Sequence, residues 1–267
     1  MSQKTISEEP PSSALPVIPP EEEELQLKRR DLAILEQDLA QKELELSTLK
    51  GEVHLFERRY HLVVGVKYTE LDGVKAQILE LASGLYPRSD EFRAGAQSAR
   101  EKAQSSAKAE EADDSDLSEV FKPSEDLKKL FRQVAKKIHP DLASDEKEKI
   151  RRHELMAKLN LAYDRLDEEA IHAVQREWEA GHHPEKNETV GTQLVKIVRQ
   201  VAQVKKRLLK IEEELVEIQN SGMHQLMHKT TEAEKTGHEL LEEMAKSVDE
   251  KINSIKSKVR DLAGEFD

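Results

Sequence analysis

Cysteine is absent from the 267-residue chain, and aromatic residues make up only 4% of it. The missing cysteines exclude disulfide bonds, thiolate catalysis and zinc–thiolate sites. At 37% hydrophobic residues, the chain also has less apolar material than one globular core of this length normally contains. We therefore expect much of it to form helices with narrow apolar seams or to remain unstructured.

The chain also lacks an excess of basic residues and any long apolar run. Its formal net charge of −12 argues against a nucleic-acid partner, because lysine and arginine make the contacts to phosphate. The longest apolar run, residues 62–66, is far too short to span a membrane. The N-terminal residues are acidic and proline-rich and lack the apolar core of a signal peptide. We expect a cytoplasmic protein without a membrane partner.

A coiled-coil pattern covers residues 21–83. An apolar residue recurs at every seventh position from Leu25 to Tyr60, and most repeats have a second apolar position between. Such a seam predicts a long helix that supercoils against a partner helix. After Tyr60 the spacing changes to threes and fours, and Gly65 and Gly73 occur there. We therefore expect a kink or a repacked segment in this stretch.

A second coiled-coil pattern covers residues 190–265. Its repeat begins at Leu194, weakens after Gly222 and returns in another phase from Leu241. The two arms are of similar length, so they could pair within one chain or associate between chains as a homodimer. The residue types at the seams do not decide between these arrangements.

Three further segments differ in composition. Residues 1–20 are rich in proline and serine, which predicts a disordered tail. Residues 84–115 are rich in alanine, serine and charge, which predicts a flexible or partly helical linker. Residues 116–180 lie between this linker and the second arm and hold the remaining apolar helical patterns.

Within this central segment, two amphipathic helices are predicted on either side of His139, Pro140 and Asp141, which we call the HPD loop. Because Pro140 cannot donate a helical hydrogen bond and disfavours helix at the preceding residue, the first helix should end there. The other faces of that helix carry lysine and arginine. The segment is thus predicted to be a helical hairpin whose loop presents an imidazole, a rigid ring and a carboxylate. The apolar faces consist of Leu127, Leu130, Phe131, Val134 and Ile138, then Leu155, Met156, Leu159, Ala162, Tyr163 and Leu166.

This pattern resembles the J domain of DnaJ-family co-chaperones. The resemblance is carried by Phe131 and Arg132, the basic helix surface, the HPD loop and the AYDRLD segment at 162–167, within a match of about a sixth of the chain. Family members usually begin with a short helix, of which residues 116–121 are an abbreviated version. The interval after the loop is longer than is usual in the family, and residues 145–152 could form an extra helical turn.

The resemblance implies an interaction role for the hairpin. A J domain docks on the ATP-bound form of a DnaK-type chaperone and stimulates ATP hydrolysis, so the catalytic chemistry belongs to that partner and no catalytic residue, cofactor or metal is expected here. Asp141 could accept two hydrogen bonds from a partner arginine, and Pro140 would limit the ordering entropy lost on docking. Positive charges would steer the helix toward an acidic surface. The residues expected to bind the DnaK-type chaperone are His139, Pro140, Asp141, Arg132, Lys136, Lys137 and Lys129.

Other interpretations of the same residues remain open. The chain could be a coiled-coil scaffold in which the J-like hairpin is purely structural, or its arms could hold an unidentified client protein directly. His182 and His183 could suggest a metal site, but adjacent side chains point in different directions and no third ligand accompanies them. Trp178, the only tryptophan, is expected to pack the following helix onto an arm or onto the hairpin.

Overall fold

A computed structural model describes residues 19–111, 121–143, 145–181 and 188–264 of the chain. These residues form helices and no strands, which confirms the predicted all-α fold. The described residues fall into two compact units, the first drawn from Met1–Leu44, Lys128–Tyr163 and Asp167–Ile211, and the second from Glu45–Leu127, Asp164–Leu166 and Glu212–Asp267. No helix in the described ranges is both long enough and apolar enough to cross a membrane.

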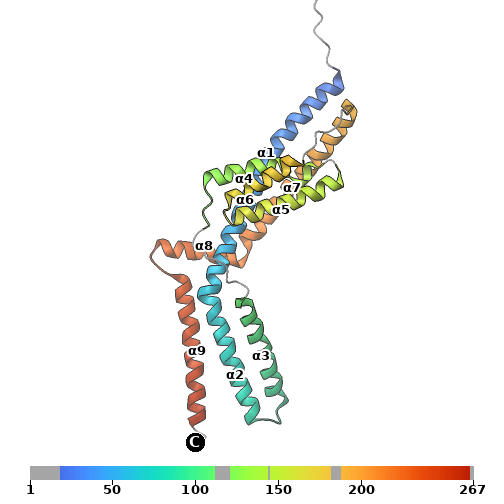
Figure 1. The fold of residues 1–267 in the computed structure, drawn as a ribbon. Helices are drawn as coiled ribbons and strands as arrows, with labels where there is room; N and C mark the ends of the chain where they lie inside the picture. The colour runs from blue at the N-terminus through green and yellow to red at the C-terminus, as the bar shows by residue number, and fades with distance from the viewer. Residues whose placement is uncertain (1–18, 112–120, 144, 182–187, 265–267) are drawn as a thin grey trace, which may run out of the picture. The chain divides into compact units, whose positions relative to one another are not determined.

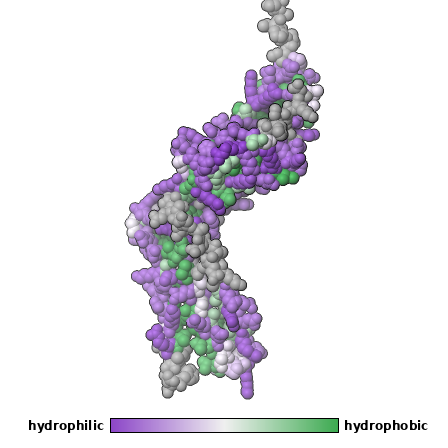
Figure 2. All heavy atoms as spheres, in the orientation of Figure 1, coloured by the Kyte–Doolittle hydropathy of each residue, from purple (hydrophilic) through white to green (hydrophobic). Residues whose placement is uncertain are grey.

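Figure 1 shows the helices with their labels. Segment η1 is a π-helical turn and η2 is a 3₁₀ turn. Hydrophilic side chains cover most of the face seen in Figure 2, as expected for a chain with 36% charged residues. The elements are α1 (Pro20–Tyr60), η1 (His61–Gly65), α2 (Val66–Leu85), α3 (Asp90–Glu111), α4 (Glu125–Ile138), η2 (Pro140–Leu142), α5 (Glu146–Asp164), α6 (Glu168–Ala180), α7 (Val190–Asn220), α8 (Gly222–Lys235) and α9 (Leu240–Gly264).

In the first unit, the two predicted coiled-coil arms pair with each other. Arg29 of α1 donates to Gln193 of α7, and Arg207 of α7 donates to Glu43 of α1, and in both cases the partners are 164 residues apart. A constant offset means that the two helices run parallel and in register. Both pairs join the positions that flank the apolar seam of a parallel coiled coil. The seam residues Leu25, Leu32 and Leu39 of α1 and Ile197, Val204 and Ile211 of α7 are buried.

Most of α4 and α5, together with α6, belongs to the first unit as well. Phe131 of α4 and Tyr163 of α5 are fully buried, and their ring centroids lie 4.7 Å apart. Ile171 of α6 is buried as well. The ring of Trp178 lies 4.6 Å from the guanidinium carbon of Arg152 on α5, so the lone tryptophan packs α6 onto the hairpin, which confirms one of its two predicted positions.

In the second unit, α2 pairs with α9 in the same parallel sense. Lys67 and Asp249 form an ion pair at 3.1 Å, and Lys256 donates to Glu70 at 2.9 Å. The buried residues of this seam are Leu71, Val74, Val248 and Ile252. The seam of the second arm thus returns in α9 after α8, as its sequence pattern predicts.

The change of apolar spacing after Tyr60 coincides with the π-helical turn η1, His61–Gly65. A π turn accommodates one extra residue, so it shifts the apolar face of the helix around its axis. The predicted repacked segment is therefore confirmed, and η1 connects the seam of α1 to the differently spaced seam of α2.

The stretch predicted as a flexible or partly helical linker, residues 84–115, forms a helix rather than a flexible linker over Asp90–Glu111. This helix, α3, lies against α2. Its half-buried residues recur at steps of three and four and are mostly small: Phe92, Gly95, Ala96, Ala99, Ala103 and Ser106. Small side chains allow close approach, and a Cβ added at Gly95 would lie 3.7 Å from Leu79 of α2.

Two expectations fall largely outside the described residues. The predicted disordered tail is described only from residue 19, and α1 begins at Pro20. Of the predicted short helix at residues 116–121, only Phe121 is described; it is buried and not helical. Its ring fills the space beside Gly51 of α1, where a Cβ would come within 2.6 Å of the ring.

Candidate functional site

The HPD loop is a compact turn. Helix α4 ends at Ile138, as the sequence predicts, and the His139 backbone is no longer helical, with φ −59° and ψ 130°. Pro140 then begins the 3₁₀ turn η2, in which the Leu142 amide donates to the His139 carbonyl at 3.1 Å. Proline suits the first position of such a turn because its fixed φ is already helical and its missing N–H would have no partner there. The backbone of the loop is therefore held in one conformation.

Arg152 of α5 ties this loop to the hairpin, and its guanidinium is buried. Its Nη1 donates to the carbonyls of Lys137 and His139, each at 3.1 Å, and its Nε donates to Glu148 at 2.8 Å. The bond to Lys137 satisfies a carbonyl in the last turn of α4, where carbonyls have no helical partner, and the bond to His139 adds to the one from the Leu142 amide. Nothing in the sequence pattern distinguishes Arg152 from the other basic residues of the hairpin. The only signal was its place in the extra turn predicted at residues 145–152, which does form the start of α5.

His139 is buried, with 3% of its side chain exposed. Its Nδ1 accepts a hydrogen bond from the Asp141 amide at 3.2 Å. The ring proton of neutral His139 therefore resides on Nε2, which donates to Oε1 of Glu43 at 3.0 Å. Because Glu43 belongs to α1, the coiled-coil arm directly contacts the first residue of the HPD loop.

Glu43 also accepts two hydrogen bonds from Arg207 of α7, at 2.7 and 3.1 Å. Burial is the largest influence on the pKa of the Glu43 carboxyl and acts to raise it. The hydrogen bonds from His139 and Arg207, together with the charge of Arg207, outweigh burial and hold that pKa below its ordinary value of 4.5. We call these three residues the Glu43 cluster; it joins α1, α7 and the HPD loop around one ionised carboxylate.

The basic residues of α4 have partners as well. Arg132 donates to Gln41 of α1 at 2.8 Å, and Lys136 lies 3.8 Å from the carboxylate of Glu36, also on α1. Lys137 contacts Glu179 of α6 at 3.4 Å, and Lys129 is exposed on α4. Two of the four predicted steering residues therefore face the arm.

The structure brings the three loop residues together, and the His139 Nδ1 lies 3.8 Å from an Asp141 carboxylate oxygen. The sequence predicts a loop that presents the imidazole, the ring and the carboxylate together, but only the carboxylate is partly exposed. Pro140 and His139 are buried, whereas 25% of the Asp141 side chain is exposed. The prediction is wrong for the imidazole and the proline ring. The imidazole is buried against Glu43 of α1, a contact between distant segments that the pattern of the hairpin does not indicate.

Other candidate sites offer less chemistry. No group of three or more histidine, aspartate or glutamate side chains in the described ranges could hold a metal ion. The pair His182 and His183 lies outside the residues that the structure describes.

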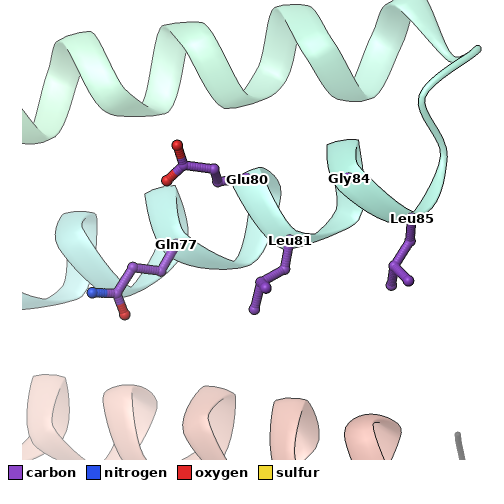
Figure 3. Close-up of a pocket in the computed structure, with 5 residues that line it drawn as sticks. All are labelled: Gln77, Glu80, Leu81, Gly84 and Leu85. Atoms are coloured by element: carbon purple, nitrogen blue, oxygen red, sulfur yellow. The ribbon is translucent and has the colours of Figure 1, made fainter.

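A pocket at the end of α2 is lined by Gln77, Glu80, Leu81, Gly84 and Leu85. Figure 3 shows the two leucines projecting from one side of the helix, away from the Glu80 carboxylate. This lining brings no reactive groups together.

The fold and the site define an all-α protein in which parallel coiled-coil helices contact a helical hairpin. No protein-family model matches the chain, and no curated protein or solved structure gives a significant match. The functional argument therefore depends on the geometry of the hairpin and its contacts.

Proposed function

We propose that the protein is a J-domain co-chaperone, which docks on the ATP-bound form of a DnaK-type chaperone and stimulates its ATPase activity. The observation that carries the proposal is the Asp141 carboxylate, which reaches solvent from a fixed turn at the end of a basic helix. The chemistry of ATP hydrolysis remains with the partner. The compartment proposed is the cytoplasm.

The turn suits a protein contact because little has to be ordered on docking. Pro140 fixes the backbone of η2, and Arg152 anchors the preceding carbonyls. A carboxylate held in this way can accept both N–H groups of a partner arginine. Lys129 and Lys137, on exposed faces of the helix, would raise the association rate with an acidic surface.

The test is single-turnover ATP hydrolysis by the DnaK-type chaperone of the same organism. Wild-type protein should accelerate hydrolysis, and Asp141→Asn should lose most of that acceleration, because an amide offers only one acceptor oxygen and no charge. Glu146→Gln is the matched control, since it removes one exposed carboxylate five positions away and should behave as wild type. Equal stimulation by Asp141→Asn and wild type would contradict the proposal.

A second candidate function is a coiled-coil scaffold in which the hairpin is structural. The burial of His139 against Glu43 favours it, because this contact gives the imidazole a role in packing. It predicts no ATPase stimulation by wild type or by any variant. His139→Gln is a poor discriminator here, because it disturbs the buried contact as well as the loop.

A further inference from the structure

We propose that α1 and α7 form a gate over the HPD loop, closed through the Glu43 cluster, and that the loop engages its partner only after Glu43 separates from His139. This inference rests on the proposed co-chaperone function and concerns the regulation of the same site. It follows from which atoms of the hairpin are already engaged.

The imidazole has no remaining hydrogen-bonding capacity in the closed arrangement. Its Nδ1 accepts from the Asp141 amide, and its Nε2 donates to Glu43. With 3% of the side chain exposed, a partner can reach neither nitrogen. Any docking that uses His139 must therefore displace Glu43.

The arm also engages the positive charges of α4. Glu36 lies beside Lys136, and Gln41 accepts from Arg132. An acidic partner surface would use the same two side chains, so α1 and the partner compete for them. If α1 moves away from one of these side chains, the partner meets less competition from α1 for the other.

Helix α7 adds the remaining contacts. Arg207 balances the charge of Glu43, and Gln200 donates to the carbonyl of Leu142, the last residue of η2, at 2.8 Å. Surface ion pairs such as the one between Glu36 and Lys136 are individually weak. The buried Glu43 cluster is consequently the contact whose loss should open the gate.

A reversible cross-link tests whether the closed arrangement is inactive. The natural chain has no cysteine, so a Glu36→Cys/Lys136→Cys variant carries only the two introduced thiols, one on α1 and one on α4. A bis-maleimide reagent with an internal disulfide joins the arm to the hairpin, and a reductant cleaves it. The joined protein should fail to stimulate the DnaK-type chaperone, and the same sample should regain stimulation after cleavage.

A matched control joins two helices away from the loop. Lys67 and Asp249 form a comparable ion pair between α2 and α9 in the second unit. A Lys67→Cys/Asp249→Cys variant, treated with the same reagent, should stimulate equally before and after cleavage. Loss of stimulation in this control too would mean that the reagent, not the gate, causes the effect, and would overturn the interpretation.

A variant that should open the gate provides the opposite test to the cross-link that holds it closed. Glu43→Gln removes the charge that holds Arg207 and weakens the bond from His139, so at limiting concentrations it should stimulate more than wild type, by about tenfold for the loss of one charge-assisted hydrogen bond. Asp38→Asn, an exposed acid on the same helix, should match wild type. Adding Asp141→Asn to Glu43→Gln should abolish the gain.

The outcomes separate the two proposals. Stimulation by the joined Glu36→Cys/Lys136→Cys protein equal to that of its cleaved form, or no gain from Glu43→Gln, overturns the gate and leaves the co-chaperone function standing. Absence of stimulation from wild type, from Glu43→Gln and from the cleaved protein overturns the co-chaperone function and the gate with it.

Discussion

Glu43 occupies a position that coiled coils usually give to a solvent-exposed charge. It flanks the apolar seam of α1, and its partner Arg207 flanks the seam of α7, which is the usual arrangement for an ion pair between parallel helices. The hairpin alters this pair by covering it, since Glu43 is only 4% exposed. An ion pair that would ordinarily lie on the surface of a coiled coil is therefore buried here, and its carboxylate binds His139 of the HPD loop.

The pKa of Glu43 predicts how acid affects the first unit. Because this pKa is lower in the folded protein than its ordinary value of 4.5, the carboxylate contributes stability that is complete above that value and is lost as pH falls through the lower, folded pKa. Glu36 acts in the opposite direction. Burial is the main influence on its pKa and raises it despite Lys136, so its protonation favours the folded state.

We therefore expect Glu43→Gln to lower the free energy of unfolding by about 1–3 kcal/mol at neutral pH. The difference from wild type should shrink as pH falls below 4.5, because wild type then loses the charge that the variant never had. Urea unfolding followed by circular dichroism at neutral and acidic pH measures the difference in the free energy of unfolding and its change with pH. A difference that stays constant or grows on acidification would contradict the assignment, and Asp38→Asn provides the baseline.

Individual helices differ in how far their sequences predict them. The seven-residue repeats locate α1, α7 and α9 because a coiled-coil seam leaves a regular apolar period, and Pro140 locates the end of α4 because proline disfavours helix before it. Helix α3 has no clear apolar period, because its packed face consists mostly of small residues, which add little to a pattern of hydrophobicity. Contacts between distant segments, such as that of Glu43 with His139, leave no local pattern at all.

The face of α3 that carries small residues leads to a separate prediction. Ala99 is half-buried on the side of α3 that carries the small residues, and Ser98 is exposed. Ala99→Lys should push α3 away from α2, at a cost of about 1–3 kcal/mol for overpacking, and should increase amide hydrogen exchange throughout α3. Ser98→Lys adds the same side chain to the solvent face and should leave exchange unchanged. Equal exchange in the two variants would show that this face does not hold α3.

At the scale of the whole chain, the seams of both arms are used within one molecule. Helix α1 pairs with α7 in the first unit, and α2 pairs with α9 in the second. Because these apolar seam residues are already buried within one chain, a second copy of the chain is not required to bury them.

We accordingly expect size-exclusion chromatography with light scattering to give the mass of one chain, 30.4 kDa, across the accessible concentration range. A mass of twice that value at all concentrations would show that the seams pair between chains. Leu39→Asp, which places a charge in a fully buried seam position, should lower helicity in a monomer and should not alter the mass.

The constant offset between α1 and α7 also has a consequence for synthesis. Residues paired across these helices are 164 positions apart, which corresponds to roughly 10–30 s of translation at typical rates. The HPD loop is made later in that interval, and Arg207 follows Asp141 by 66 positions, or roughly 3–13 s of translation. The newborn chain therefore passes through a period in which the loop exists without its complete cover, and we expect its affinity for a chaperone to be highest before Arg207 is made.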